Sequence, residues 1–410
     1  MGFVRRYWRQ QVPESGPLRG MAAGVLVTTA GEGAWYTSWA IYFTTIAGLK
    51  VEVVGVGLLI AGAVALGAAA PLGGLADRLG PRDVLVALVA VDGLSMAAFA
   101  VVRSVVPFLL VAVVNTVADR ASAGVKTTYV AGLVPTGSRI GELARQRVAS
   151  HVGYTLGASA GAIALSIDTT AVFTALIAIN AATSLIYAGL LSRAPVVAAE
   201  SRTPSTRSRS IIRDHAFLAV VTSTGALSLC WGLVSTGLPL WLIRDTRLPA
   251  TLAAAVIIIN SLGIALLQVS ASRGCDTARP ASHRAVWSGG ALALACLLLA
   301  STRGADGLLA GCVVVAAAGA HLAGELWFIA SKWGLTLDLT PPGHTGQYQG
   351  AASTTQAAAQ MISPALMTLL IGSWGQPGWF ILAALFASSG LAAIPTTRWA
   401  IRTRPPTAPA

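Results

Sequence analysis

Long apolar runs separated by short polar stretches dominate the pattern of this chain. The 410 residues contain twelve such runs, each close to the ~20 residues with which an α-helix crosses the hydrocarbon core of a membrane. The predicted spans are 21–48, 52–74, 84–102, 105–133, 148–167, 170–191, 216–242, 249–272, 285–301, 307–330, 349–371 and 378–396. The pattern predicts an all-α polytopic membrane protein with twelve transmembrane helices.

Composition and charge support a membrane protein and argue against a nucleic-acid partner. The chain is 55% hydrophobic and only 11% charged, whereas soluble domains carry about a quarter charged residues. Of its 28 Lys and Arg residues, 21 lie at predicted inner ends, five at outer ends and two inside spans. This asymmetry predicts cytoplasmic termini in a multi-pass cell-membrane protein that contacts anionic lipid. High Ala, Gly and Arg with few Lys suggests a bacterial origin.

Similar features recur 199 residues apart, which indicates an internal duplication. The repeat pairs are Asp77 with Asp276, Gly33 with Gly232, Glu32 with Trp231, and Tyr42 with Trp241. We therefore predict two six-helix bundles, 1–191 and 216–410, that face each other across a central cavity. The Arg-, Ser-, Thr- and Pro-rich segment 192–215 between them is predicted to be a flexible cytoplasmic linker.

A short charged loop with several glycines separates the second and third spans. Residues 73–82 read Gly-Gly-Leu-Ala-Asp-Arg-Leu-Gly-Pro-Arg. Glycine permits a sharp turn and close backbone approach, and the charges can form ion pairs in one state and lose them in another. The segment resembles the loop between helices 2 and 3 of the major facilitator superfamily, with Pro81 where that family often has a basic residue. The predicted conformational-switch residues are Gly73, Asp77, Arg78, Gly80 and Arg82, with the carboxylate near a helix N-terminus of the other half.

Two further motifs extend the resemblance, which covers the whole chain. Arg120 followed by Gly124 resembles a motif of span 4 that the family links to proton coupling. Gly153, Gly157 and Gly161 resemble a glycine-rich motif of span 5 that is associated with exporters, although alanine replaces the proline expected after Gly157. The same ladder is typical of a close-packing seam between helices. The resemblance is to twelve-helix members that export drugs and natural products.

Ionisable residues inside the spans point to a polar interior. Each would cost about 2.5–3.5 kcal/mol facing lipid, so they must face protein or water. At ~100° per residue, polar and aromatic residues form stripes on spans 1, 4, 7 and 10, which the resemblance places around the substrate cavity. The candidate cavity residues are Thr28, Glu32, Trp35, Tyr36, Trp39, Asn115, Trp231, Ser235 and Glu325. The proton-coupling candidates are Glu32, Asp119, Arg120, His321 and Glu325.

Several of these residues also have purely structural interpretations. Glu32 could hydrogen-bond a neighbouring helix, and Arg120 could pair with Asp119 or with Asp92 of span 3. His321 and Glu325, at i and i+4, could bond each other. The aromatic residues of span 1 could form part of an interfacial belt. We expect Asp92 to have a packing or ion-pair role off the cavity.

The sequence predicts a transporter and no enzyme. It has no Walker A loop, no dinucleotide-binding glycine loop and no strand pattern, and its four cysteines suggest no disulfide, metal site or cofactor. The resemblance implies a monomeric secondary transporter that works by alternating access. We predict proton-coupled antiport that exports a small drug-like or natural-product molecule and can confer antibiotic resistance, with Glu32 as the first coupling residue. The alternatives are an importer or facilitator of a small metabolite, and a transport-dead sensor or scaffold.

Overall fold

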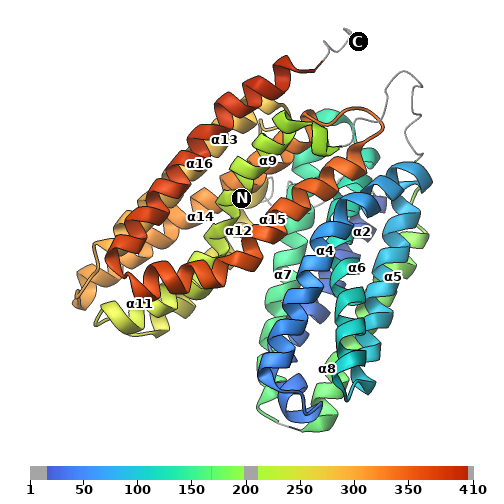
Figure 1. Ribbon diagram of the computed structural model, residues 1–410, viewed down its shortest axis with the longest axis horizontal. Coiled ribbons are helices and arrows are strands. Elements are labelled where there is room, and N and C mark those ends of the chain that lie inside the picture. Colours follow the sequence, from blue (N-terminus) through green and yellow to red (C-terminus); the bar gives the residue numbers. More distant parts are fainter. Residues whose placement is uncertain (1–15, 168, 198–210, 405–410) are drawn as a thin grey trace, which may run out of the picture. The chain divides into compact units, whose positions relative to one another are not determined.

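The computed structural model describes residues 16–167, 169–197 and 211–404. The described residues are helical, with short connections and no strand. The chain divides into two compact units: Met1–Thr203 with Pro341–Thr354, and Pro204–Thr340 with Thr355–Ala410 (Figure 1). Most of the predicted linker, residues 198–210, lies outside the described residues.

The first unit is a bundle of long helices, coloured blue to green in Figure 1. Its elements are α2 (Gly16–Tyr36), α3 (Trp39–Ile41), the π-helical η1 (Tyr42–Ile46), α4 (Val51–Leu79), α5 (Pro81–Ala98), η2 (Phe99–Val101), α6 (Val105–Leu133), η3 (Thr136–Ser138), α7 (Arg139–Leu165) and α8 (Thr170–Ser192). The beginning of α15 (Thr345–Met367) belongs to this unit by its contacts.

The second unit holds the remaining helices, coloured green to red. Its elements are η4 (Ile211–Arg213), α9 (His215–Ala226), η5 (Leu227–Leu229), α10 (Cys230–Gly232), the π-helical η6 (Leu233–Gly237), α11 (Leu238–Asp245), α12 (Thr251–Ala271), α13 (Ala278–Ala300), α14 (Gly307–Asp338), the rest of α15, η7 (Thr368–Ser373) and α16 (Gln376–Arg402). The helix α15 thus begins in one unit and continues in the other.

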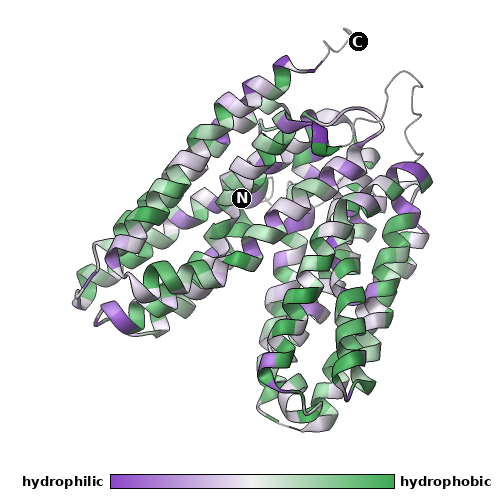
Figure 2. Cartoon of the chain, viewed as in Figure 1, coloured by the Kyte–Doolittle hydropathy of each residue, from purple (hydrophilic) through white to green (hydrophobic). Residues whose placement is uncertain are grey.

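Membrane-length helices confirm the predicted class of an all-α polytopic membrane protein. Among the described residues, nine helical segments are long and apolar enough to cross a membrane. They are α4, α5 with η2, α6, α8, α9 to α11, α12, α13, α14 and α16. The other three predicted spans lie on α2, α7 and α15, which are richer in glycine and polar residues, so the count of twelve stays a prediction. Figure 2 shows hydrophobic residues along the helices and hydrophilic ones gathered at helix ends.

An aromatic cluster forms part of the hydrophobic core of the first unit. Phe43 packs edge-on against Phe99 and Phe108, with ring centroids 5.0 and 4.9 Å apart. Tyr42 is fully buried beside them. Such edge-to-face pairs add about 0.5–1.5 kcal/mol beyond the apolar area that they bury.

The glycine ladder of α7 is a packing seam, as one interpretation of the sequence predicted. Gly153, Gly157 and Gly161 face α2 so closely that a Cβ at Gly157 would collide with the carbonyl oxygen of Ala30. On the α2 side, Gly33 approaches the backbone of α7 in the same way. Small residues of this kind allow helix backbones in membranes to approach each other closely.

Equivalent contacts inside the two units support the predicted duplication. In the first unit, Arg103 donates a hydrogen bond of 3.1 Å to the Tyr42 hydroxyl. In the second, the Trp241 indole donates one of 2.9 Å to Thr302. Trp241 follows Tyr42, and Thr302 follows Arg103, by the same 199 residues. Gly232 also repeats the role of Gly33, since each abuts the partner helix of its own unit, α15 or α7.

Candidate functional site

The charged loop joins α4 to α5 in a single sharp turn. The helix α4 ends at Leu79, and α5 begins at Pro81. Gly80 between them has φ of +95°, a conformation that residues with a Cβ rarely adopt. Pro81 occupies the first turn of α5, where its missing N–H has no intrahelical partner in any case. The departure from the family pattern at this position therefore helps to start the third span.

Asp77 caps the N-terminus of α15. Its carboxylate accepts hydrogen bonds from the backbone N–H groups of Gly346, at 2.5 Å, and Gln347, at 2.9 Å. Only 8% of Asp77 is exposed. The first N–H groups of a helix have no intrahelical acceptor and carry a partial positive charge, so a carboxylate there is stabilising. The sequence predicted this carboxylate at a helix N-terminus of the other half. The structure places it at the N-terminus of α15, whose residues up to Thr354 group with the first unit.

Backbone-to-backbone contact accompanies this cap. A Cβ at Gly73 would collide with the carbonyl oxygen of Gly346, and a Cβ at Gly346 would collide with the carbonyl oxygen of Gly73. One helical turn later, Gly350 approaches Ala69 equally closely. The Thr354 hydroxyl lies 3.1 Å from the carbonyl oxygen of Leu66. The first turns of α15 therefore lie along α4 without intervening side chains.

The arginines of the loop differ in their surroundings. Arg82 forms an ion pair of 2.8 Å with Asp83 and donates a 3.0 Å hydrogen bond to the carbonyl oxygen of Ala194, just beyond α8. Arg78 is exposed. Arg82 thus holds the start of α5 to the end of α8, a contact that the sequence pattern does not indicate.

A hydrogen-bonded network centred on Asp92 joins four helices of the first unit. Asn115 of α6 donates to one carboxylate oxygen at 2.8 Å and lies 3.1 Å from the Ser95 hydroxyl. Ser184 of α8 donates to the other carboxylate oxygen at 3.1 Å. The Thr28 hydroxyl of α2 lies 3.3 Å from the Ser184 hydroxyl oxygen and completes the hydrogen-bonded network. Of the predicted cavity residues, Asn115 therefore binds Asp92 directly and Thr28 reaches it only through Ser184. The sequence predicted a packing role for Asp92.

Glu32 lies half-buried on α2, near charged groups of α6. It interacts electrostatically with the Asp119 carboxylate and the Lys126 ammonium. Asp119 also lies 3.8 Å from Arg120 in a pair whose side chains are 56% and 45% exposed. Of the two partners considered for Arg120, the structure shows Asp119. The charged stripe of α6 therefore acts on Glu32 of α2 within one unit.

The aromatic residues beside Glu32 occupy two environments. Trp35 packs edge-on against Tyr42 and Phe43, with ring centroids 5.6 and 5.8 Å away. Trp39 packs against the same buried cluster. Tyr36, by contrast, is 64% exposed and stacks at a tilt on Tyr154 of α7. Of the three predicted cavity aromatics of the first span, Tyr36 is the most accessible.

A second buried acid, Glu325 of α14, is held by neutral donors of the second unit. The Trp231 indole N–H donates to one of its carboxylate oxygens at 2.7 Å. The Asn260 amide of α12 donates to the other at 2.8 Å. Glu325 is only 2% exposed, and Phe328 packs edge-on against Trp231 at 5.6 Å. Two predicted cavity residues, Trp231 and Glu325, are thus brought together.

His321 belongs to the same network through Asn260, not through Glu325 itself. One ring nitrogen, Nε2, lies 2.8 Å from the carbonyl oxygen of Cys230, and the other, Nδ1, lies 3.3 Å from the Asn260 amide nitrogen. A carbonyl oxygen can only accept, so Nε2 carries the proton and Nδ1 accepts from Asn260. The direct i, i+4 bond considered from the sequence is replaced by a bridge, because both ring nitrogens are engaged elsewhere.

The remaining predicted cavity residue is Ser235, and two residues of the networks were not predicted. Ser235 is exposed on η6, 3.5 Å from the Thr236 hydroxyl. Asn260 and Ser184 were not among the residues that the sequence predicted. Asn260 has a signal, since its amide interrupts a run of apolar residues on α12. Among the described residues, no group of three or more His, Cys, Asp or Glu could hold a metal ion.

Comparison with known proteins agrees with this fold. The sequence model of the Major Facilitator Superfamily matches residues 21–364. A bacterial homologue of the iron transporter ferroportin has a TM-score of 0.73 at 16% identity, covering 95% of this chain and all of its own. The Escherichia coli fucose:proton symporter also shares the fold, with a TM-score of 0.68 at 14% identity, covering 93% of this chain and 98% of its own. The human organic anion transporter MFSD10 has a TM-score of 0.60 at 19% identity, covering 93% of this chain and all of its own. No curated protein shows significant similarity to the chain.

Proposed function

The chain belongs to the major facilitator superfamily and is therefore a membrane transporter rather than an enzyme, and we propose that it is a proton-coupled exporter of small, moderately hydrophobic molecules. In this proposal it works by alternating access in the cell membrane, as a monomer with both termini in the cytoplasm. Its halves are 1–191 and 216–410. Its cargo belongs to the drug and natural-product class, so activity would confer resistance to such compounds.

The Glu325 network is the observation that carries proton coupling. An ionised carboxylate accepts from both Trp231 and Asn260. Protonation turns one of these oxygens into a hydroxyl, which is a weaker acceptor and must itself donate to an acceptor. Uptake of one proton would therefore weaken the hydrogen bond to either Trp231 of α10 or Asn260, the bridge to His321. Proton binding is thereby linked to a rearrangement between helices.

Glu32 is the second proposed coupling group, in the other unit. It is half-buried near Lys126 and Asp119, so its charge depends on the charges of α6. A cationic or zwitterionic cargo that approaches Tyr36 would compete with a proton for this carboxylate. Glu32→Gln should then abolish proton-driven accumulation and spare binding of a neutral cargo. The exposed Glu52→Gln, at the start of α4, is the matched control.

The Asp77 cap supplies the proposed conformational switch. The helix α15 starts against α4 and continues, after Thr354, in the second unit. Any movement of α15 away from α4 must break the two hydrogen bonds to Asp77 and separate Gly73 from Gly346. Both contacts stabilise the state in which they are formed. Because both are non-covalent, they can break and form again, as a reversible gate requires.

Everted vesicles with a panel of cationic, zwitterionic, neutral and anionic compounds test the function. Uptake that is driven by an acidic vesicle interior and accompanied by release of protons from the lumen supports export. Accumulation only in right-side-out vesicles would replace export by import. Proton and compound fluxes equal to those of vesicles without the protein would favour the sensor or scaffold alternative.

Cysteine labelling tests the proposed topology independently of substrate. Single cysteines at Ser201 and Arg103 should react from the cytoplasmic and external sides, respectively. Labelling of position 201 from outside, or of position 103 only from inside, would reverse the orientation and with it the assigned direction of transport.

A further inference from the structure

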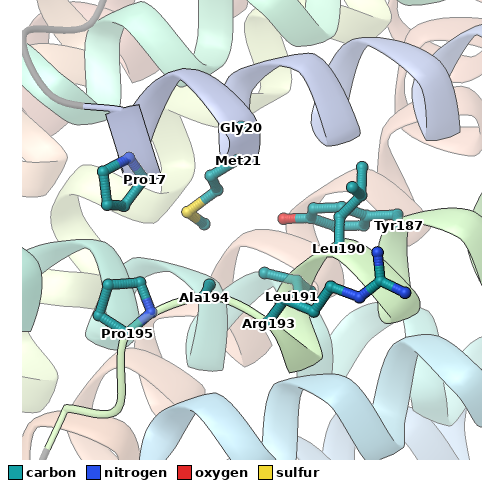
Figure 3. Close-up of a pocket in the computed structure, with 9 residues that line it drawn as sticks. All are labelled: Pro17, Gly20, Met21, Tyr187, Leu190, Leu191, Arg193, Ala194 and Pro195. Carbon is teal, nitrogen blue, oxygen red and sulfur yellow. The ribbon is translucent and has the colours of Figure 1, made fainter.

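A cavity of about 190 Å³ lies inside the first unit, between the start of α2 and the end of α8 (Figure 3). Most of its wall is apolar and includes Met21, Leu190 and Leu191. Neither Glu32 nor Asp92 lines it. The cavity is thus separate from the charged groups to which the transport function is assigned.

The size of the cavity decides what kind of molecule it can accept. Pockets for drug-sized ligands usually enclose about 300–1,000 Å³. A cavity of about 190 Å³ can enclose only part of such a molecule. An occupant of that size or larger must therefore leave part of its structure outside the cavity. A membrane lipid does so, because α8 is a membrane-length helix and the cavity lies at its end.

Tyr187 places a polar group inside this apolar wall. The residue is 3% exposed, and its hydroxyl is buried with no hydrogen-bond partner among the described residues. Figure 3 shows the hydroxyl directed toward the space between Met21 and Leu191. A buried hydroxyl without a partner is unfavourable, so an occupant with an acceptor oxygen would be preferred to a pure hydrocarbon.

Arg193 adds a positive charge to the same wall. It directly follows α8, is exposed, and lines the cavity. A guanidinium at this level of a membrane helix favours phosphate, with which it can form two parallel hydrogen bonds. An apolar wall, a buried hydroxyl and an adjacent guanidinium match the succession of acyl chain, ester and phosphate in a lipid.

We propose that this cavity binds one anionic phospholipid from the adjacent leaflet. Arg193 pairs with the phosphate, Tyr187 donates a hydrogen bond to an ester or phosphate oxygen, and the first carbons of an acyl chain lie against Met21 and Leu191. The remainder of the lipid stays in the bilayer. Such a lipid would brace the start of α2 against the end of α8.

Native mass spectrometry of the full-length protein, titrated with phosphatidylglycerol or phosphatidylcholine of identical acyl chains, tests this site. Three variants probe it: Tyr187→Phe, Arg193→Gln and Gly20→Leu. Gly20 lines the cavity, and a Cβ added there meets nothing within 4 Å, so Gly20→Leu begins a bulky side chain at the wall without a backbone collision. Arg279→Gln, an exposed arginine elsewhere, is the charge-matched control. Equal melting temperatures without added lipid establish that the variants are folded.

We expect one saturable phosphatidylglycerol site, at least about tenfold tighter than phosphatidylcholine. Tyr187→Phe and Arg193→Gln should each weaken it about tenfold, Gly20→Leu should weaken both lipids, and Arg279→Gln should change nothing. Equal binding of the two lipids, or binding unaffected by the three variants, would overturn the proposal. So would competition by inorganic phosphate at equal concentration, which indicates a site for the anion alone. Tighter lipid binding after deletion of residues 2–14 would identify the chain's own segment as the occupant.

Discussion

The two units share a framework but bury different chemistry. Tyr42 with Arg103, and Trp241 with Thr302, make matching contacts 199 residues apart. The acids within the units do not match: Asp92 is half-buried among hydroxyls and one amide, whereas Glu325 is 2% exposed and held by an indole and an amide.

The repeat-equivalent positions of α6 and α14 make this contrast sharper. Glu325 follows Lys126 by the same 199 residues, so one unit has an anion where the other has a cation. Contacts that hold helices together are thus kept in both units, while the ionisable groups have diverged. Duplication supplies a symmetric scaffold, and the polar residues make it asymmetric.

The strongest test of this asymmetry is Glu325→Gln. The amide resembles the protonated acid, and its NH₂ group must face a donor, Trp231 or Asn260. We expect proton-driven accumulation to be lost and the protein to be destabilised by about 1–3 kcal/mol, since a buried donor loses its acceptor. Vesicle uptake and thermal unfolding measure the two effects. A variant that still accumulates cargo with an unchanged pH dependence would remove Glu325 from coupling.

The contact of α4 with α15 is tested by two neighbouring glycines. Gly73→Ala places a methyl group against the Gly346 carbonyl oxygen and should cost about 1–3 kcal/mol in the state that holds this contact. Gly74→Ala meets nothing closer than 3.8 Å, so it should be neutral or stabilise α4 by up to about 1 kcal/mol. Transport rates and unfolding of the two variants distinguish them. Similar behaviour of both would argue against close contact.

Asp77→Asn tests the charge of the cap while keeping its shape. The amide can accept from only one of the two N–H groups and loses the attraction to the helix N-terminus, about 0.3–1 kcal/mol. We expect transport to slow by roughly fivefold, the factor that ~1 kcal/mol represents, with substrate affinity near normal. Glu52→Gln, an exposed acid at the start of α4, serves as the control. Full turnover of Asp77→Asn would contradict the switch role.

The smallest effect is expected for Asp92→Asn. Ser184 and Asn115 donate to this carboxylate, but the Ser184 hydroxyl can rotate and accept from the new amide. Unfolding should therefore shift by less than about 1 kcal/mol, with proton-driven transport retained. A loss of proton coupling as large as that of Glu325→Gln would show that both networks take part in coupling. The functional contrast between the two units would then disappear.

Local sequence determined much of this protein, because its strongest signals are local. Apolar run length places the helices, Gly80 and Pro81 specify the turn after α4, and the 199-residue offset identifies the repeat. Helical periodicity also places His321 and Glu325 on one stripe of α14. All of these depend on residues close in the chain, or on a pattern that the chain repeats.

Tertiary structure alone decided which groups meet between helices. Asn260 reaches Glu325 across 65 residues, and Ser184 reaches Asp92 across 92. Periodicity gives the face of one helix but neither the neighbour that it meets nor the rotation and depth at which it packs. For the same reason, Trp35 and Trp39 pack on the aromatic cluster, and the cavity at Tyr187 has no sequence signature. These contacts follow from side-chain packing between distant segments, which a single sequence does not display.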